Sequence, residues 1–540
     1  MKNWHRLFSV AVALLLGLTG TLALADGMPT PEPNVMPIAN GDITLSIYVS
    51  MPNEARQKYT TLADHPVVKQ IAAETGLNFE FIHPPEGDDG TFFNTTLASG
   101  QYPDIFSASF VNYPGGPEGA MDDGVLINMD ELIDQYAPNF WDIVRSRGEK
   151  FNQEIRGDGG AIIKFGTIWL PEFVNDRTQT GFMVRKDWMT EWGLEAPTTL
   201  DEFTELLRAF KEHGVEVPLA ISNFLDTVDN SNYNNYNIIA GAFGVAFKDF
   251  TLDEEGNVVY TRIDPAYKDF LTYMNGLVNE GLIDRDFITR KTSDALKLFY
   301  NGRAGMTYFH SSNYRDAMAA GVTVDPDFDV LPIVHPKMTE DQVIHISHRT
   351  QSIYDAAWYV TSACEHPVEA VRFIDYLHAE ETRKLTAWGL GNEEYPTYTL
   401  DENGMRVFTE FMTNNPELTD FATARALFTL SPFQVMYDNE MEMQQYGDAV
   451  REAWATWQTG TDNLQKLPRT RTKTQEEQTE LNDIMNTINT YADELTLKMI
   501  VGDVSLDEFD TMVETIKSLN IERAIEIEQA ACDRYNSRTN

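Results

Sequence analysis

Every second residue of the stretch DITLSIYVS (42–50) is apolar, from Ile43 to Val49, and the residues between them are mostly polar. This period of two predicts a β-strand. Residues 77–84 and 102–109 are comparable short stretches and are expected to form two further strands.

Two helical segments separate these strands. Residues 64–76 have the spacing of a helix, with Asp64 as the expected N-cap and Gly76 as the expected end. A short helix is expected over 94–99. Because the links are short, this alternation of strands and helices predicts a parallel sheet with right-handed crossovers.

A second group of helices and strands begins near residue 182. Thr199 and Glu202 have the spacing of a capping box at the start of a helix over 196–214, whose apolar residues recur every three or four positions. Asp264 is the expected N-cap of a similar helix over 262–284. The pattern therefore predicts a second α/β unit.

The C-terminal part of the chain has mainly helical patterns. Residues 365–385 are expected to form one helix opened by a proline, and the last hundred residues are expected to be helical. Ser505 and Glu508 have the spacing of another capping box. Two α/β lobes followed by a helical C-terminal region are therefore predicted.

The first residues, 1–25, have the pattern of a signal peptide. A short basic start precedes an apolar run from Leu7 to Leu18, which is too short to span a bilayer. Ala23-Leu24-Ala25 supplies a small-x-small cleavage site, so the mature chain is expected to begin at Asp26. The alternative is a retained N-terminal anchor.

The cleavage region also resembles a lipoprotein box. Residues 18–20 match its first three positions, but Thr21 stands where the lipid-modified cysteine is required. The following segment, 26–41, is rich in proline and polar residues and is expected to be a flexible tether. An exported protein without the usual lipid anchor, extracellular or associated with the cell surface, is therefore expected.

The length and charge of the chain narrow its possible functions. A chain of 540 residues is too long for one hydrophobic core. With 83 acidic and 41 basic residues the net charge is −42, which repels nucleic-acid phosphates and disfavours an anionic glycan at long range. Salt screens this field beyond about 8 Å, so a local basic pocket can still override it. Cys364 and Cys532 are expected to be two buried thiols rather than a disulfide.

Common catalytic and metal-binding motifs are absent from the sequence, including GxxxxGK[ST], GxSxG, HExxH and CxxC. His345 and His348 are three residues apart, but their surroundings favour a strand or loop. Residues 253–260 lack the final glutamate of a calcium loop and are better explained by a β-hairpin. No catalytic residue, metal or cofactor is expected, although 83 carboxylates leave chance acid pairs for glycoside hydrolysis open.

Several segments, in order along nearly the whole chain, resemble one protein family. They are TTLASGQYPDIF (95–106), LINMDELIDQYAPNF (126–140), VRKDWMTEWGLEAPTTLDEFTELLRAFK (184–211), YKDFLTYMNGLVNEGLID (267–284), FYNGRAGM (299–306), CEHPVEAVRFIDYL (364–377) and EEYPTYTLDENGM (393–405). Together they resemble the extracellular solute-binding proteins of family 1, in the subgroup of large Gram-positive lipoproteins. These are the oligosaccharide-binding components of ATP-binding-cassette importers.

The resemblance implies an α/β, two-lobe periplasmic-binding-protein-like fold (type II) with a hinge and a helical C-terminal region. The lobes are expected to close over a sugar, and the chain to cross between them about three times. The expected division is 42–168 for the first part of lobe 1, 169–345 for lobe 2, 346–405 for the return to lobe 1, and 406–540 for a helical region packing mainly on lobe 2.

Sugar recognition requires aromatic faces for the ring and polar groups for its hydroxyls. The resemblance places Trp169 at the first crossover as a stacking platform, with interlobe packing as the alternative. His310 and Ser311 end the strand after GRAGM, where relatives often carry a ligand-stacking aromatic.

The stretch WGLGNEEYPTY (388–398) matches a family turn imperfectly. Glu394 takes the position of the family's acid, Tyr395 replaces a glycine, and Tyr398 aligns with the family's tyrosine. Glu394 is therefore expected to contact a sugar hydroxyl, and Tyr395 to narrow the cleft or add a stacking face.

Three further candidates each have a structural alternative. Asn235 and Tyr236 belong to an amide-rich loop suited to hydroxyl binding, or to a solvated turn. Asp104 is expected at the end of a strand beside the crevice, or as a helix cap. Ligands bind beyond the carboxyl ends of parallel strands, which also points to the loops 50–53 and 107–112.

These observations predict a non-enzymatic, monomeric binding protein for an oligosaccharide, neutral in view of the acidic surface. The expected partner is the membrane permease of an ATP-binding-cassette importer, and nucleic acid is not expected as a partner. Two alternatives remain open: a secreted glycan-active enzyme, and a surface glycan sensor without transport.

Overall fold

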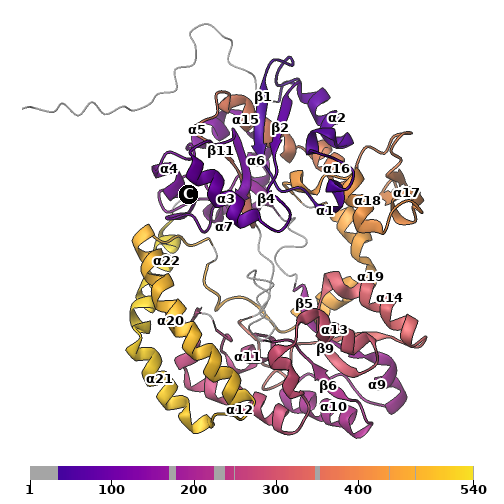
Figure 1. Ribbon diagram of the computed structural model, residues 1–540, viewed down its shortest axis with the longest axis vertical. Helices are drawn as coiled ribbons and strands as arrows, with labels where there is room; N and C mark the ends of the chain where they lie inside the picture. The colour runs from indigo at the N-terminus through magenta and orange to yellow at the C-terminus, as the bar shows by residue number, and fades with distance from the viewer. Residues whose placement is uncertain are drawn as a thin grey trace, which may run out of the picture.

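Two separate sheets, each with its own core, divide the chain into two lobes (Figure 1). The computed structural model describes residues 34–168, 178–223, 237–248, 250–346, 353–436, 438–468 and 470–538. The predicted two-lobe α/β fold is confirmed.

The sheet of lobe 1 has the strand order β2-β1-β3-β11-β4. Its strands are β1 (Thr44–Tyr48), β2 (Asn78–Ile82), β3 (Ile105–Ser109), β4 (Gly166–Ile168) and β11 (Ile353–Val360). The three strands expected from the sequence pair in parallel, and β11 runs antiparallel to β3 and β4. Leu45 and Ile47 are completely buried, so the alternating pattern of β1 marks its core-facing side.

Helices cover this sheet and extend beside it. They are α1 (Asn53–Arg56), α2 (Pro66–Thr75), α3 (Asp89–Ser99), α4 (Gly116–Asp122), α5 (Asp130–Tyr136), α6 (Pro138–Arg147), α7 (Glu149–Glu154), α15 (Pro367–His378), α16 (Glu380–Trp388), α17 (Glu410–Thr413) and α18 (Phe421–Phe428), with a hairpin of β12 (Tyr398–Leu400) and β13 (Arg406–Phe408). The single helix predicted over 365–385 is two helices, because Ala379 adopts an extended conformation between α15 and α16.

The start of α2 corrects the predicted N-cap. Asp64 lies in a preceding 3₁₀ turn, and the Nδ1 atom of His65 accepts a hydrogen bond from the Val67 N–H at 3.2 Å. Gly76 ends the helix as predicted, with φ +67°. Glycine is required there because a Cβ atom would lie 1.9 Å from the Ala39 carbonyl oxygen.

The described end of the predicted tether, residues 34–41, packs against lobe 1. Ile38 and Ala39 are buried, and the Ile38 N–H donates to the Thr75 carbonyl oxygen at 2.7 Å. Arg372 donates to the Val35 carbonyl oxygen. The tether prediction is therefore wrong for these residues, because two apolar side chains within a proline-rich stretch find a place in the core.

The sheet of lobe 2 has the order β10-β5-β9-β6. Its strands are β5 (Thr180–Arg185), β6 (Val217–Ala220), β9 (Ala304–His310) and β10 (Val330–Ile333), and its helices are α9 (Lys186–Trp192), α10 (Leu200–Glu212), α11 (Asn237–Ala240), α12 (Pro265–Asn279), α13 (Thr292–Tyr300) and α14 (Tyr314–Val324). The capping box of Thr199 and Glu202 and the N-cap Asp264 are confirmed. The expected hairpin is formed by β7 (Phe250–Leu252) and β8 (Val258–Tyr260).

Four long helices complete the chain: α19 (Asn439–Gln458), α20 (Gln475–Ile500), α21 (Phe509–Ser518) and α22 (Ile521–Ser537). The apolar side chains of α20, α21 and α22 join the core of lobe 2, whereas Phe408 to Met436 contribute to the core of lobe 1. Residues 406–540 thus contribute side chains to the cores of both lobes. Ser505 caps only a 3₁₀ turn and α21 begins at Phe509, so the second capping box is not formed.

The chain passes between the lobes from β4 to β5, from β10 to β11 and from α18 to α19. The first and third passages lie side by side, because the Ile168 N–H donates to the Val435 carbonyl oxygen at 2.7 Å. This pairing joins the two connecting segments where they leave lobe 1. No helix in the described ranges has the length and apolarity needed to cross a membrane.

Replacing Gly181 by alanine is expected to lower the free energy of unfolding by about 1–3 kcal/mol. A Cβ atom there would lie 2.2 Å from Cδ1 of Trp457, which is completely buried and donates to the Phe182 carbonyl oxygen at 3.2 Å. Gly276→Ala is the matched control, since its Cβ would meet open space within α12 and should raise stability by about 0.5–1 kcal/mol. Urea unfolding measures both, and equal effects would contradict the packing argument.

Stability is expected to fall as the pH falls from 7 to 5. Burial lowers the pKa of His65, His335 and His378 to about 4, so the unfolded chain binds more protons in this range. Each histidine should cost about 2 kcal/mol at pH 5, while Asp375, whose pKa burial raises to about 6, acts in the opposite direction. Urea unfolding of the wild type and of His378→Gln at several pH values measures the contribution of His378 to this pH dependence. Parallel stability profiles of the two proteins would show that His378 makes no such contribution.

Candidate functional site

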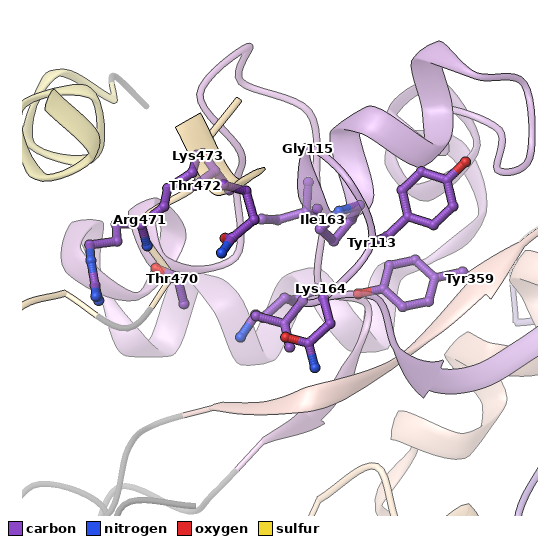
Figure 2. A pocket seen from close by; sticks show the side chains of 14 residues that line it. Tyr113, Gly115, Ile163, Lys164, Tyr359, Thr470, Arg471, Thr472 and Lys473 are labelled. Carbon is purple, nitrogen blue, oxygen red and sulfur yellow. The ribbon is translucent and has the colours of Figure 1, made fainter. Parts of the chain in front are cut away.

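A pocket of about 230 Å³ lies between lobe 1 and the segment that leads into α20 (Figure 2). Its lining residues are Val111, Asn112, Tyr113, Gly115, Gly116, Pro117, Ile163, Lys164, Tyr359, Thr470, Arg471, Thr472, Lys473 and Gln478. Pockets for drug-sized ligands usually have about 300–1,000 Å³. This pocket is therefore large enough for one part of an oligosaccharide and not for a whole chain.

The lobe 1 wall is the loop that follows β3, at the carboxyl edge of the parallel strands. This loop overlaps the region 107–112 expected from the sequence to border a ligand. Phe110 is completely buried against Tyr359, with ring centroids 5.0 Å apart, and Tyr113 donates to Asp123 at 2.9 Å. These contacts fix the loop, and Asn112 lines the pocket beside them.

The opposite wall, residues 470–473, is anchored in lobe 2 at both ends. Before it, Lys466 pairs with Thr251 of β7, and after it α20 packs into the core of lobe 2. Between these anchors the segment reaches lobe 1, where the Thr472 hydroxyl donates to Asp158. The pocket is therefore an interlobe site.

Asp158 connects lobe 1 to the C-terminal helix. Its carboxylate accepts from Arg534 Nε at 3.1 Å and from Arg538 Nη2 at 2.7 Å, and the Arg538 side chain is only 1% exposed. Glu118 holds the Asp158 loop by accepting its N–H at 2.7 Å. Gly157 permits this approach, since a Cβ atom there would lie 2.1 Å from the Glu118 carboxyl carbon.

The pocket lining is basic. Lys164 is 5% exposed, and Arg471 and Lys473 share the carboxylate of Glu528, at 2.6 and 3.0 Å. Burial, followed by repulsion from Arg471, lowers the pKa of Lys473. The two cations lower the pKa of Glu528 despite its burial. The arrangement can therefore bind anionic or hydroxyl groups.

Three of the predicted ligand residues, Trp169, Asn235 and Tyr236, lie outside the described residues. His310 ends β9 opposite Thr180 in lobe 2, as expected, and is half-buried. Ser311 follows it, with its N–H donating to the Gln179 carbonyl oxygen at 2.8 Å and its side chain 2% exposed. Both residues stand at a strand end of lobe 2, away from the lining of the pocket.

Three other candidates lie on lobe 1 near α18. Glu394 is exposed and hydrogen-bonds Tyr395, which raises the pKa of that phenol, and the Tyr395 ring packs against Phe428 with centroids 5.9 Å apart. Tyr398 contacts Trp388, with centroids 6.1 Å apart, and the Arg406 guanidinium lies 5.2 Å from its ring. The Tyr398 ring is therefore engaged in packing.

Asp104 is not at the strand end that sequence analysis expected. It precedes β3, at the amino edge of that strand, and its carboxylate accepts from the Ser46 N–H at 2.7 Å and the Ser46 hydroxyl at 2.6 Å. These bonds tie β3 to β1. The placement was wrong because the pattern located the strand but not which of its ends carried the aspartate.

Among the described residues, no three histidine, cysteine or acidic side chains form a group that could hold a metal ion. His345 pairs with Asp462 at 2.9 Å. Cys364 and Cys532 are both free thiols, and burial raises the pKa of Cys364 to about 12. Cys532 is buried as expected, whereas Cys364 is half-buried.

The basic pocket residues Lys164, Arg471 and Lys473 were missed by sequence analysis. Lys164 lies about 300 positions before Arg471 and Lys473, and the three follow no recognisable motif. Only the path of the segment after α19 brings them together. A cluster of basic residues at 469–473 within an acidic chain was the one available signal.

The two-lobe fold is that of a binding protein, and comparison with known proteins agrees. The model of the family "bacterial extracellular solute-binding protein" matches residues 61–384. The chain belongs to this family.

Relatives share the fold at low identity. The fructooligosaccharide ABC transporter substrate-binding protein FusA of Streptococcus pneumoniae is 23% identical over 290 residues, half of this chain and 49% of FusA, so the match spans about half of that relative. The polygalacturonan/rhamnogalacturonan-binding protein YtcQ of Bacillus subtilis is 22% identical over 96% of both chains. A solved solute-binding protein from Bifidobacterium longum subsp. infantis is 16% identical, with a TM-score of 0.74 over 91% of this chain and 98% of that one.

Asp158→Asn is expected to lower the free energy of unfolding by about 2 kcal/mol, because it leaves the buried guanidinium of Arg538 without its carboxylate. The matched control is Asp142→Asn on lobe 1, whose side chain is 77% exposed beside Arg145 and should matter by less than about 0.5 kcal/mol. Urea unfolding compares them. Equal values would show that the Asp158 contact does not stabilise the chain.

Proposed function

We propose that the protein captures an oligosaccharide outside the cell and delivers it to the permease of an ATP-binding-cassette importer. The observation that carries this proposal is the interlobe pocket, whose walls come from lobe 1 and from a segment anchored twice in lobe 2. A ligand seated there contacts both lobes. The names of FusA and YtcQ, both glycan-binding proteins, support a sugar as the ligand.

Hinge closure provides the mechanism. Three passages of chain join the lobes, two of them paired at Ile168 and Val435, and the contact between Asp158 and Arg538 is a further link across which the lobes must rotate. A sugar that touches both lobes only when they are close biases the open–closed equilibrium toward the closed form. The permease then binds the closed form. The protein acts as a monomer and does not cleave the sugar.

Aromatic stacking supplies part of the affinity. Trp169 at the first crossover and His310 with Ser311 at the end of β9 are the proposed lobe 2 contacts, and Glu394 with Tyr395 the proposed lobe 1 contacts. Asn235 and Tyr236 extend the set. Thr21 replaces the lipidated cysteine, so we expect the chain from Asp26 to be released or held by partners.

The test is a titration of the chain from Asp26 with neutral and acidic oligosaccharides, monitored by the fluorescence of its nine tryptophans. Saturable binding of an intact sugar is expected, and Trp169→Ala should weaken it about tenfold through loss of stacking. Trp192→Ala is the matched control. Its ring stacks on His213, 4.1 Å between centroids, on a helix of lobe 2, and its loss should leave affinity unchanged.

Product analysis of the same samples separates binding from catalysis. Cleavage of the sugar over hours would show that the protein is a glycan-active enzyme rather than a binding protein. Binding without uptake in cells that carry the permease would favour the surface sensor. Absence of binding to every sugar would overturn the proposal.

A further inference from the structure

We propose that the interlobe pocket binds the carboxylate of an acidic sugar unit, so that the captured oligosaccharide is a uronate-containing glycan. This inference rests on the proposed capture of an oligosaccharide. It replaces the neutral ligand that the overall charge of the chain predicts.

The composition of the lining is the first argument. The chain has about twice as many acidic as basic residues, 83 against 41, yet the pocket is lined by three basic residues and no acidic one. The charged residues of the pocket lining are therefore opposite in sign to the majority of those in the chain. Arg471 and Lys473, side by side in a concave site, raise the local potential.

The pairing of these bases is the second argument. Arg471 and Lys473 share one carboxylate, that of Glu528, which is itself 3% exposed. The nearby carboxylate of Asp158 is already engaged by Arg534 and Arg538. Two cations and one anion leave an excess positive charge next to the pocket. Burial, followed by repulsion from Arg471, lowers the pKa of Lys473, while Glu528 acts in the opposite direction.

The remaining lining suits a sugar rather than a bare ion. Asn112, Gln478 and Tyr359 carry groups that bond hydroxyls, and Tyr113 adds an aromatic ring. Figure 2 shows Tyr359 and Tyr113 on the side of the pocket opposite Arg471. A volume of about 230 Å³ matches a subsite for one unit, with the rest of the ligand in the cleft between the lobes.

The acidic surface does not prevent this binding. At physiological salt its field is screened beyond about 8 Å, so contacts within the pocket dominate the bound state. The long-range repulsion slows association instead. The association rate of an acidic sugar should therefore increase with added salt.

The experiment compares two ligands of equal size, trigalacturonate and its methyl-esterified form, by calorimetry at physiological ionic strength with the chain from Asp26. We expect the free acid to bind at least tenfold more tightly. Lys473→Gln should remove most of this preference and leave the affinity for the ester unchanged, while Arg471 keeps Glu528 paired. Lys164→Gln is a second variant with the same expectation.

The matched control is Lys498→Gln, which removes the same charge from an exposed position of α20 paired with Glu494. It should leave both affinities unchanged. Thermal unfolding of each variant checks that the fold persists. A general effect of net charge would appear in Lys498→Gln as strongly as in Lys473→Gln and would overturn the inference.

The remaining outcomes separate the two proposals. Equal affinity for acid and ester, or binding of the neutral trisaccharide kestose alone, would overturn the carboxylate subsite and leave sugar capture intact. Equally tight binding of inorganic phosphate or free galacturonate would assign the pocket to small anions and also overturn it. No binding of any oligosaccharide would overturn the proposed function itself.

Discussion

The contact of Asp158 with Arg534 and Arg538 is the interaction on which the interlobe architecture depends. It joins a loop of lobe 1 to the end of α22, while α20, α21 and α22 contribute their apolar faces to the core of lobe 2. Because the Arg538 side chain is almost fully buried, removing its carboxylate partner costs more than breaking an exposed ion pair. It also holds Thr472, and with it one wall of the pocket.

The pocket beside this contact is basic although the protein as a whole is strongly acidic. A net charge of −42 keeps the surface repulsive to polyanions at long range, but charge acts on a bound ligand over a few ångströms. Glu528 neutralises only one of its two basic neighbours. Surface charge and site charge are therefore independent properties, and the average over the sequence is a poor guide to the ligand.

Local patterns predicted the elements better than their ends. The strands 44–48 and 105–109 and the capping box of Thr199 follow from contacts within a few residues. The predicted caps at Asp64 and Ser505 failed, because in both places a 3₁₀ turn precedes the helix and shifts its start. Residues 34–41 were misjudged because composition does not reveal that Ile38 fits a distant core.

The two α/β lobes, the family and the loop after β3 follow from the amino-acid sequence alone, because hydrophobic periodicity and the alternation of strands and helices are local features of the chain. Only the tertiary structure decided that Asp104 ties strands together at the wrong edge for a ligand, and that Lys164 meets Arg471 and Lys473. The reason is physical: a site between lobes is built from segments hundreds of residues apart, and no local pattern records which of them the cores bring together.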